Sequence, residues 1–203
     1  ELEGVVNFGQ DSSFAGNKTA QGNQDGNDIG DFYYAPPTGF LSLCTSNLDT
    51  PTVIPSEHFN PVLYTGNATA RSITGVGFQP DFVWLKERSS TSSHALYDAV
   101  RGVNKQLSSN LTNAEDSSNT NIFTAFNSDG FSVGVNNQTN QSGVTMAAWN
   151  WKAGGSAVSN TNGSITSSVS ANVDAGFSIA TFVLPTTATT IGHGLSKPPE
   201  LIF

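Results

Sequence analysis

The alternation of apolar and polar residues predicts short β-strands from residue 59 onward. In GVTMAAWNWKAG (143–154), Trp149 and Trp151 fall on one face of a strand, because side chains two positions apart point the same way. The segment DFVWLKER (81–88) opens on a continuous apolar run, which is typical of a strand buried on both faces at its start. Strands are also predicted at 59–66, 94–100 and 176–185, a hairpin at 121–135 that turns at 128–130, and a helix only at 104–111.

The first part of the chain lacks this alternation. Residues 1–35 are dense in Gly, Asn and Asp, which predicts loops with short strands at Val5–Phe8 and Phe32–Tyr34. The prolines of DTPTVIPSEH (49–58) predict an extended linker, because proline fixes its own backbone and restricts the residue before it. We therefore expect a domain boundary near residue 57.

Two parts of the chain match one another at a spacing of about 118 residues. FNPVLYTGNATARSI (59–73) aligns with FSIATFVLPTTATTI (177–191), and the match continues through a Gly-x-Gly turn into PDFVW (80–84) and PELIF (199–203). A period of this length is a whole domain rather than a solenoid unit. The sequence therefore predicts the end of an upstream domain with its linker at 1–57, a complete repeat at 58–175, and the start of a second repeat at 176–203.

The composition agrees with an all-β fold. The 203 residues include 13 Phe and 3 Trp, enough for a packed core, while only 12% are charged and good helix formers are sparse. We therefore expect antiparallel β-sandwich modules in tandem. Cys44 is the single cysteine, so no internal disulfide forms, and stability must come from packing or oligomerisation.

The charge of the chain excludes several classes of partner. The net charge is −8 with a pI of about 4.6, and no basic stripe exists that could replace counterions on nucleic-acid phosphates. An anionic membrane surface is disfavoured for the same reason. No run is long and apolar enough to span a bilayer, and no charged-then-apolar leader opens the chain. We expect neither nucleic-acid binding nor membrane insertion.

A glycine-containing loop, NQDGNDIGD (23–31), carries oxygen-bearing side chains of the kind that calcium prefers. The loop lacks the glutamate that completes a helical-loop calcium site, and its residues are also ordinary turn formers. We favour the turn interpretation, keep calcium as the alternative, and expect no metal and no cofactor. The candidate ligands are Asn23, Asp25, Asn27, Asp28 and Asp31.

No catalytic constellation stands out in the sequence. His94 and Asp98 lie close to serines at 90–93, but on a strand their Cβ atoms are about 13 Å apart, and no nucleophile-elbow G-x-S-x-G is present. We expect Asp98 to pair with Arg101 and anchor a loop. The acidic residues are scattered, whereas glycoside hydrolysis needs two carboxylates facing one cleft. The sequence therefore predicts no enzyme.

Aromatic residues are the candidates for ligand binding. Trp149 and Trp151 would form a platform for sugar rings if exposed, and Tyr97 is a third candidate for the same carbohydrate site. If buried, the two indoles are core, which is the default in a sandwich. The many Asn, Ser, Thr and Gln side chains suit hydrogen bonding to carbohydrate, and they suit a charge-poor soluble surface equally well.

Several stretches resemble structural proteins of marine tailed bacteriophages. Those at 6–16, 22–48 and 51–59 are similar to the C-terminal part of SPRY-like, concanavalin-type domains. Those at 77–115, 126–134, 147–155 and 176–182 look like the repeated module that follows such domains in tail fibres and related virion proteins. The resemblance implies sandwiches of a jelly-roll or concanavalin-like kind, tandem copies and a place on the virus particle.

These observations lead to an expected function. We expect a structural virion protein of the tail fibre, or associated with the tail, that assembles as a homotrimer with other virion proteins. Its polar loops would present a binding surface to a host-surface glycan, with avidity from several copies. One alternative is a carbohydrate-binding module of an extracellular polysaccharide-degrading enzyme, and another is a purely architectural capsid or fibre decoration.

Overall fold

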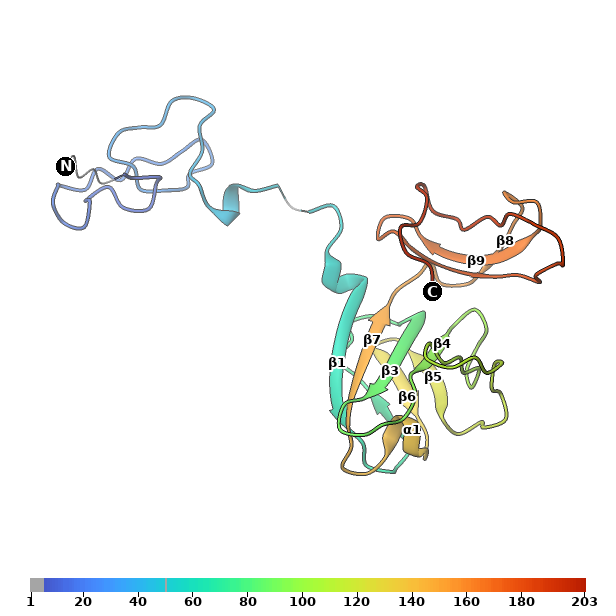
Figure 1. Cartoon of the computed structure of the whole chain (residues 1–203). Helices are drawn as coiled ribbons and strands as arrows, with labels where there is room; N and C mark the ends of the chain where they lie inside the picture. The colour runs from blue at the N-terminus through green and yellow to red at the C-terminus, as the bar shows by residue number, and fades with distance from the viewer. Residues whose placement is uncertain (1–5, 50) are drawn as a thin grey trace, which may run out of the picture. The chain divides into compact units, whose positions relative to one another are not determined.

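The computed structural model describes residues 6–49 and 51–203, which form two compact units (Figure 1). One unit ends at Thr52 and the other runs from Val53 to Phe203. The boundary expected near residue 57 falls inside the second unit, in the 3-10 turn η2 (Pro55–Glu57). Within the described ranges, no helix is both long and apolar enough to cross a membrane.

The second unit is built around a two-layer antiparallel β-sandwich, which confirms the all-β fold (Figure 1). The first sheet has the order β1-β7-β3-β4 and the second has the order β2-β6-β5. A single short helix follows the second sheet in the chain. The elements are β1 (Phe59–Thr65), β2 (Arg71–Ile73), β3 (Phe82–Glu87), β4 (Ala95–Asp98), β5 (Phe123–Asn127), β6 (Gly130–Val133), α1 (Asn137–Asn140) and β7 (Thr145–Trp151).

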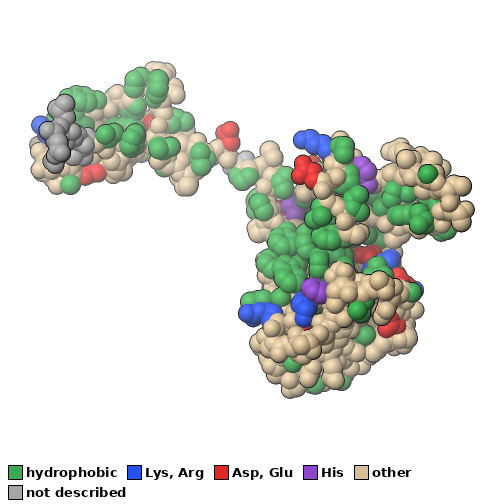
Figure 2. Space-filling model, in the orientation of Figure 1, with side chains coloured by type: hydrophobic (Ala, Val, Ile, Leu, Met, Phe, Trp, Pro, Cys, Tyr) green, Lys and Arg blue, Asp and Glu red, His purple; other side chains and the backbone are tan. Residues whose placement is uncertain are grey.

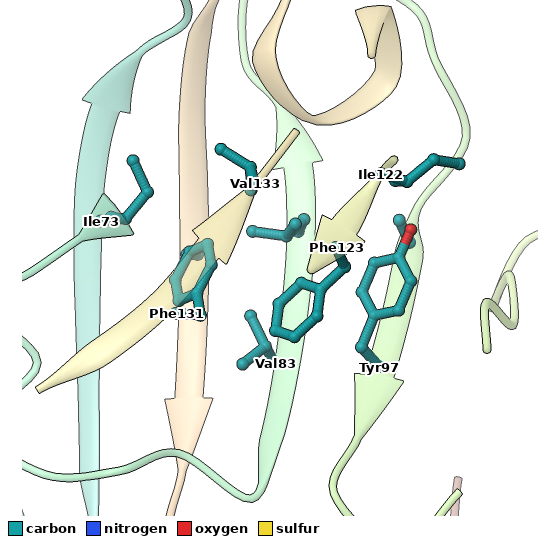
Figure 3. Close-up of a cluster of buried hydrophobic side chains, with 10 residues drawn as sticks. Ile73, Val83, Tyr97, Ile122, Phe123, Phe131 and Val133 are labelled. Atoms are coloured by element: carbon teal, nitrogen blue, oxygen red, sulfur yellow. The ribbon is translucent and has the colours of Figure 1, made fainter. Parts of the chain in front are cut away.

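Apolar side chains from both sheets meet in one core (Figure 3). The Phe123 ring stacks on Tyr97 at 4.6 Å and on Phe131 at 5.4 Å, so three aromatic rings bridge the two layers. Val83 and Val133 are also fully enclosed. Burying such side chains contributes about 1.5–3 kcal/mol each, which makes this layer contact the main source of stability for the sandwich.

A third antiparallel sheet follows the sandwich in the same unit. It contains β8 (Val158–Asn160), β9 (Ser167–Asn172) and β10 (Phe177–Thr181) in the order β10-β9-β8. The Phe177 ring packs against Trp151 at 6.0 Å and against Phe82 at 6.1 Å. The buried Asp81 carboxylate accepts a 2.8 Å hydrogen bond from Ala153 N–H in the connection from β7 to β8. The third sheet is thereby joined to the sandwich by aromatic packing and by a buried polar contact.

The aligned segments of the internal repeat share only their first strand. Phe59 opens β1 and Phe177 opens β10, as the alignment predicts. However, β1 pairs with β7, whereas β10 pairs with β9. Residues 201–203, expected to match the start of β3, are exposed and form no strand. The tandem arrangement therefore stays a prediction.

The helix predicted at 104–111 is absent, and this prediction was wrong. Gln106 exchanges two 2.9 Å backbone hydrogen bonds with Asp116, and Leu107 exchanges two with Leu96. These backbone groups pair with distant parts of the chain, so they are not available for the local i to i−4 bonds of a helix. Helix propensity in this segment is overridden by its place beside the edge strand β4.

The first unit contains no regular strand among its described residues. Of the strands predicted there, Val5 lies outside the described residues, 6–8 are irregular, and Phe32 makes only a single bridge to Asn23. The one regular element over 6–49 is the 3-10 turn η1 (Thr45–Asn47). The two strand predictions were therefore wrong, because turn-forming Asn, Asp and Gly residues decide the backbone here.

Candidate functional site

Trp149 and Trp151 share the outer face of the β1-β7-β3-β4 sheet, as the alternation predicts. In the strand register, Trp151 lies between Phe59 and Phe82 on the two neighbouring strands. Its ring centroid is 4.8 Å from that of Phe59 and 5.4 Å from that of Phe82. Phe177 covers it from β10, so this half-buried indole is packed among other rings and joins the third sheet to the sandwich.

Trp84 extends this aromatic face toward β4. Its indole Nε1–H donates to His94 Nδ1 at 2.7 Å, and its ring makes an edge contact with Trp149 at 6.1 Å. Burial lowers the pKa of His94, with the positive charge of Lys86 adding to the effect. The outer rings therefore pack mainly on one another, and His94 serves as an acceptor for an indole.

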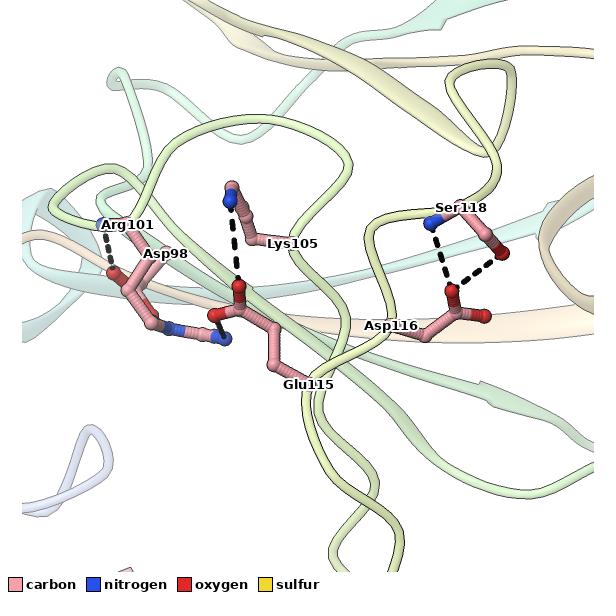
Figure 4. Close-up of polar contacts among 6 residues, drawn as sticks. All are labelled: Asp98, Arg101, Lys105, Glu115, Asp116 and Ser118. Atoms are coloured by element: carbon pink, nitrogen blue, oxygen red, sulfur yellow. Dashed lines mark hydrogen bonds and ion pairs between the residues drawn. The ribbon is translucent and has the colours of Figure 1, made fainter.

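The hydrolase alternative at His94 and Asp98 finds no support in this geometry. Both oxygens of Asp98 are occupied by Arg101, whose Nε lies 2.5 Å from Oδ2 and whose backbone N–H lies 2.8 Å from Oδ1 (Figure 4). The predicted Asp98–Arg101 pair is confirmed. Arg101 also contacts Glu115 at 3.0 Å, so the pair anchors the loop that follows β4.

Tyr97 does not lie with the two tryptophans. It belongs to the opposite face of the sheet, is fully buried, and stacks on Phe123 in the core (Figure 3). Its ring therefore offers no surface to a sugar, and the structure removes Tyr97 from the candidate platform. Its hydroxyl instead points to the loops beyond β4, where it donates to Gln106 Oε1 at 2.7 Å.

An open polar pocket of about 500 Å³ lies at these loops. We call it the amide pocket, because side-chain amides and hydroxyls dominate its lining. Three separate segments build it: the loop between β3 and β4, the loop between β4 and β5, and the start of α1. The lining residues are Ser92, Ser93, Gln106, Ser108, Leu111, Asn113, Ala114, Asp116, Asn136, Asn137 and Gln138.

A chain of hydrogen bonds, which we call the amide relay, fixes two of these side chains. Gln106 Nε2 donates to Gln138 Oε1 at 3.1 Å, and Gln138 Nε2 donates to the backbone carbonyl of Ser93 at 3.2 Å. Because that carbonyl can only accept, the orientations of both amides follow from it, and Tyr97 O–H must be the donor at the other end. Burial raises the pKa of Tyr97 and keeps its hydroxyl protonated.

Other side chains of the amide pocket remain available to a ligand. Within the described chain, the side-chain amides of Asn113 and Asn137 and the hydroxyls of Ser92 and Ser108 form no hydrogen bond. An amide offers both donors and an acceptor, and a hydroxyl offers both as well. The pocket thus combines a fixed pair of glutamines with a set of unengaged polar groups.

In the 23–31 loop, the carboxylate of Asp25 is occupied by hydrogen bonds from other residues of the first unit. Asp25 accepts from the N–H groups of Asn27, Ile29 and Ser42 and from the amide of Asn47 at 2.7–3.1 Å. These hydrogen bonds hold the pKa of Asp25 well below its usual range, although burial acts in the opposite direction. Among the described residues, no group of three His, Cys, Asp or Glu is placed to share a metal ion. The geometry favours the turn interpretation.

Sequence reasoning missed the amide pocket. Its segments come from three loops that are far apart in the chain, and only the strand order places them together. One signal was present: Asn, Gln and Ser are dense at 104–118 and again at 136–141.

Comparison with known proteins assigns the second unit to a family. No curated protein and no solved structure matches the chain. A family model matches residues 54–203, a range that begins one residue inside the second unit. It includes the sandwich, the third sheet and every residue of the amide pocket. The chain therefore belongs to the family described as a domain of unknown function, DUF7483.

Proposed function

We propose that the protein is a structural component of a virion, in a tail fibre or associated with the tail, and that its sandwich binds a host-surface glycan. The observation that carries the glycan part is the amide pocket with its fixed relay. The place on a virus particle is supported by the sequence resemblance to phage structural proteins.

The chemistry of the amide pocket favours a polyhydroxylated ligand. Sugar hydroxyls both donate and accept hydrogen bonds, and so do the amides and hydroxyls of the lining. Gln106 and Gln138 are already oriented, so binding does not have to order them. Leu111 supplies an apolar contact for the carbon face of a sugar ring.

The same lining supports binding without hydrolysis. Asp116 is its one carboxylate, whereas glycoside hydrolysis uses a pair across the scissile bond. We therefore propose a non-enzymatic receptor-facing role. A weak single site would gain avidity from several copies in a homotrimer, and light scattering on the intact protein measures that oligomeric state directly.

The experiment is a titration of the protein with a panel of neutral oligosaccharides by isothermal calorimetry. Gln138→Ala removes the centre of the relay and is expected to weaken binding about tenfold, since one lost hydrogen bond is worth about 1–1.5 kcal/mol. Asn162→Ala is the matched control, because its exposed side chain lies in the β8–β9 turn, outside the pocket lining. Equal affinity of Gln138→Ala and the wild type contradicts the proposed site.

The variant Tyr97→Phe tests whether the amide relay prepares the pocket for its ligand. The variant keeps the ring that stacks on Phe123 but loses the hydroxyl that orients Gln106. We expect weaker glycan binding while the protein remains folded, as monitored by tryptophan fluorescence. Binding unchanged in this variant means that the relay does not prepare the pocket.

A purely architectural role is the second candidate, and the aromatic outer face favours it. Trp151 and Trp84 pack against neighbouring rings, so they stabilise the unit and do not form a free platform for a sugar. In this case no member of a broad glycan panel binds. The remaining alternative, a carbohydrate-binding module of a polysaccharide-degrading enzyme, predicts the same pocket binding but a monomer in solution.

A further inference from the structure

We propose that the amide pocket prefers a saccharide that carries a protonated amino group, and that Asp116 recognises this group. The inference rests on the proposed function, because it specifies the ligand of the same pocket. It follows from the position of Asp116, from its unoccupied oxygen and from the charges around it.

The backbone places Asp116 directly beside the amide relay. Asp116 N–H donates to the Gln106 carbonyl at 2.9 Å, and Gln106 N–H donates to the Asp116 carbonyl at 2.9 Å. This two-bond bridge fixes the backbone of Asp116 in the loop between β4 and β5, and the side chains of both residues line the amide pocket. A ligand held by Gln106 therefore lies within reach of Asp116.

The two oxygens of the Asp116 carboxylate differ in their surroundings (Figure 4). Oδ1 accepts from Ser118 N–H at 2.8 Å and from Ser118 Oγ at 2.6 Å. These bonds lower the pKa of Asp116, so the group is ionised at neutral pH. Oδ2 receives no hydrogen bond from the described chain and can accept one from a ligand.

Nearby cations do not neutralise Asp116. Arg101 is engaged by Asp98 and Glu115, and Lys105 lies 3.4 Å from Glu115 (Figure 4). No lysine or arginine is part of the pocket lining. The pocket therefore presents one uncompensated negative charge among neutral amides and hydroxyls.

This charge arrangement discriminates among sugars. An ammonium group donates a charge-assisted hydrogen bond to Oδ2, which is stronger than a bond from a neutral hydroxyl. A carboxylate or phosphate on the sugar would be repelled by Asp116. Because Asp116 is solvent-exposed, screening limits the expected preference for the amino sugar to about five- to tenfold in affinity.

The test compares oligomers of glucosamine with the N-acetylated oligomers of the same length. The two share one carbon skeleton, and only the former carry ammonium groups. Affinities are measured by calorimetry at low and high salt for wild type, Asp116→Asn and Asp174→Asn. The last variant makes the same change in net charge at an exposed position outside the pocket lining, and so controls for general attraction to an acidic protein.

We expect wild type and Asp174→Asn to prefer the glucosamine oligomer at least about fivefold at low salt, and Asp116→Asn to lose that preference. Equal affinity for both oligomers, or a preference that survives in Asp116→Asn, overturns the inference and leaves the proposed glycan site standing. If neither oligomer binds, or if only the N-acetylated oligomer binds, the inference is also overturned. The panel of neutral oligosaccharides decides the proposed function separately.

Discussion

The two units of the chain place their aromatic residues differently. In the sandwich, Phe123 and Phe131 are fully buried between two sheets and no strand is left without apolar contacts. In the first unit, Tyr34 is 81% exposed and Phe40 is 67% exposed, and aromatic rings line an open groove of about 510 Å³. Hydrophobic side chains lie at the surface of this unit (Figure 2). The groove residues gather at the surface rather than in a core.

Polar contacts take the place of a core in the first unit. The carboxylate of Asp25 accepts from two donors in its own loop and from Ser42 and Asn47 outside it. Asp31 Oδ2 accepts from the Ser12 N–H. Such contacts are directional and depend on ionised carboxylates. The sandwich is held by apolar burial, which is insensitive to pH. One chain thus contains a unit held by polar contacts, which acid can disrupt, and a unit held by apolar burial, which the loss of a core side chain can disrupt.

The largest expected effect comes from opening the aromatic core. Phe123→Ala removes the ring that joins Tyr97 and Phe131, and we expect a loss of about 3–5 kcal/mol in the free energy of unfolding. All three tryptophans belong to the second unit, so urea unfolding followed by tryptophan fluorescence reports on this unit and not on the first. The amide NMR signals of Ser42 and Ile29 report on the first unit and should not change. If the amide signals of the first unit are lost together with the tryptophan signal of the second, the two units are not stabilised independently.

The next effect concerns the hairpin between β5 and β6. Gly130 has φ = +120°, and a Cβ there would lie 2.1 Å from the backbone oxygen of Ile73 on β2. Gly130→Ala is therefore expected to destabilise the sandwich by about 2 kcal/mol or more. Gly143→Ala is the control, with φ = +76° but open space around it, and should cost only about 1 kcal/mol. If the two variants lose a similar amount of free energy of unfolding in urea, the close approach of residue 130 to β2 does not determine the cost.

Acid should destabilise the first unit more than the second. The pKa of Asp25 is lowered in the folded state, so its contribution to stability is present above the ordinary aspartate pKa and is lost as the pH falls through the folded value. Burial raises the pKa of Asp81 in the sandwich, so its contribution is present at low pH and is lost as the pH rises. Between pH 6 and pH 2, we expect the amide signals of Ser42 and Ile29 to collapse before tryptophan fluorescence changes.

A matched variant sharpens this pH prediction. Asp25→Asn cannot be protonated, so it should weaken the first unit at neutral pH and make its amide signals less dependent on acid. The tryptophan transition of the second unit should stay in place. If the first unit of Asp25→Asn remains as acid-sensitive as that of the wild type, other carboxylates control the transition.

The smallest expected effect is at the surface of the second unit. Lys105 lies 3.4 Å from Glu115, and both side chains are partly exposed. Solvent screens such pairs, so Lys105→Ala should change the free energy of unfolding by less than about 0.5 kcal/mol. Urea unfolding measures this difference against the wild type. A loss above 1 kcal/mol would mean that the pair is essential to the loop after β4.

Most strands of the sandwich were predictable from local patterns of apolar residues, whereas the short strand β2 was not predicted. The shared face of Trp149 and Trp151 followed directly from their spacing. The sequence gives no such signal for the side on which Tyr97 lies, because all four residues of β4 are buried. The amide pocket depends on long-range pairing, as when Leu107 bonds to Leu96 instead of continuing a helix. Such contacts are set by tertiary structure and not by local propensity.

We propose that the amide pocket, rather than the aromatic outer face, is the glycan-binding site. The most direct test is a ¹H–¹⁵N NMR titration of the intact protein with the best-binding oligosaccharide of the panel. We expect shifts in the side-chain amide signals of Gln106 and Gln138, with the indole N–H signals of Trp149 and Trp151 unchanged. Shifts confined to the indoles, with the two glutamines unaffected, would contradict it.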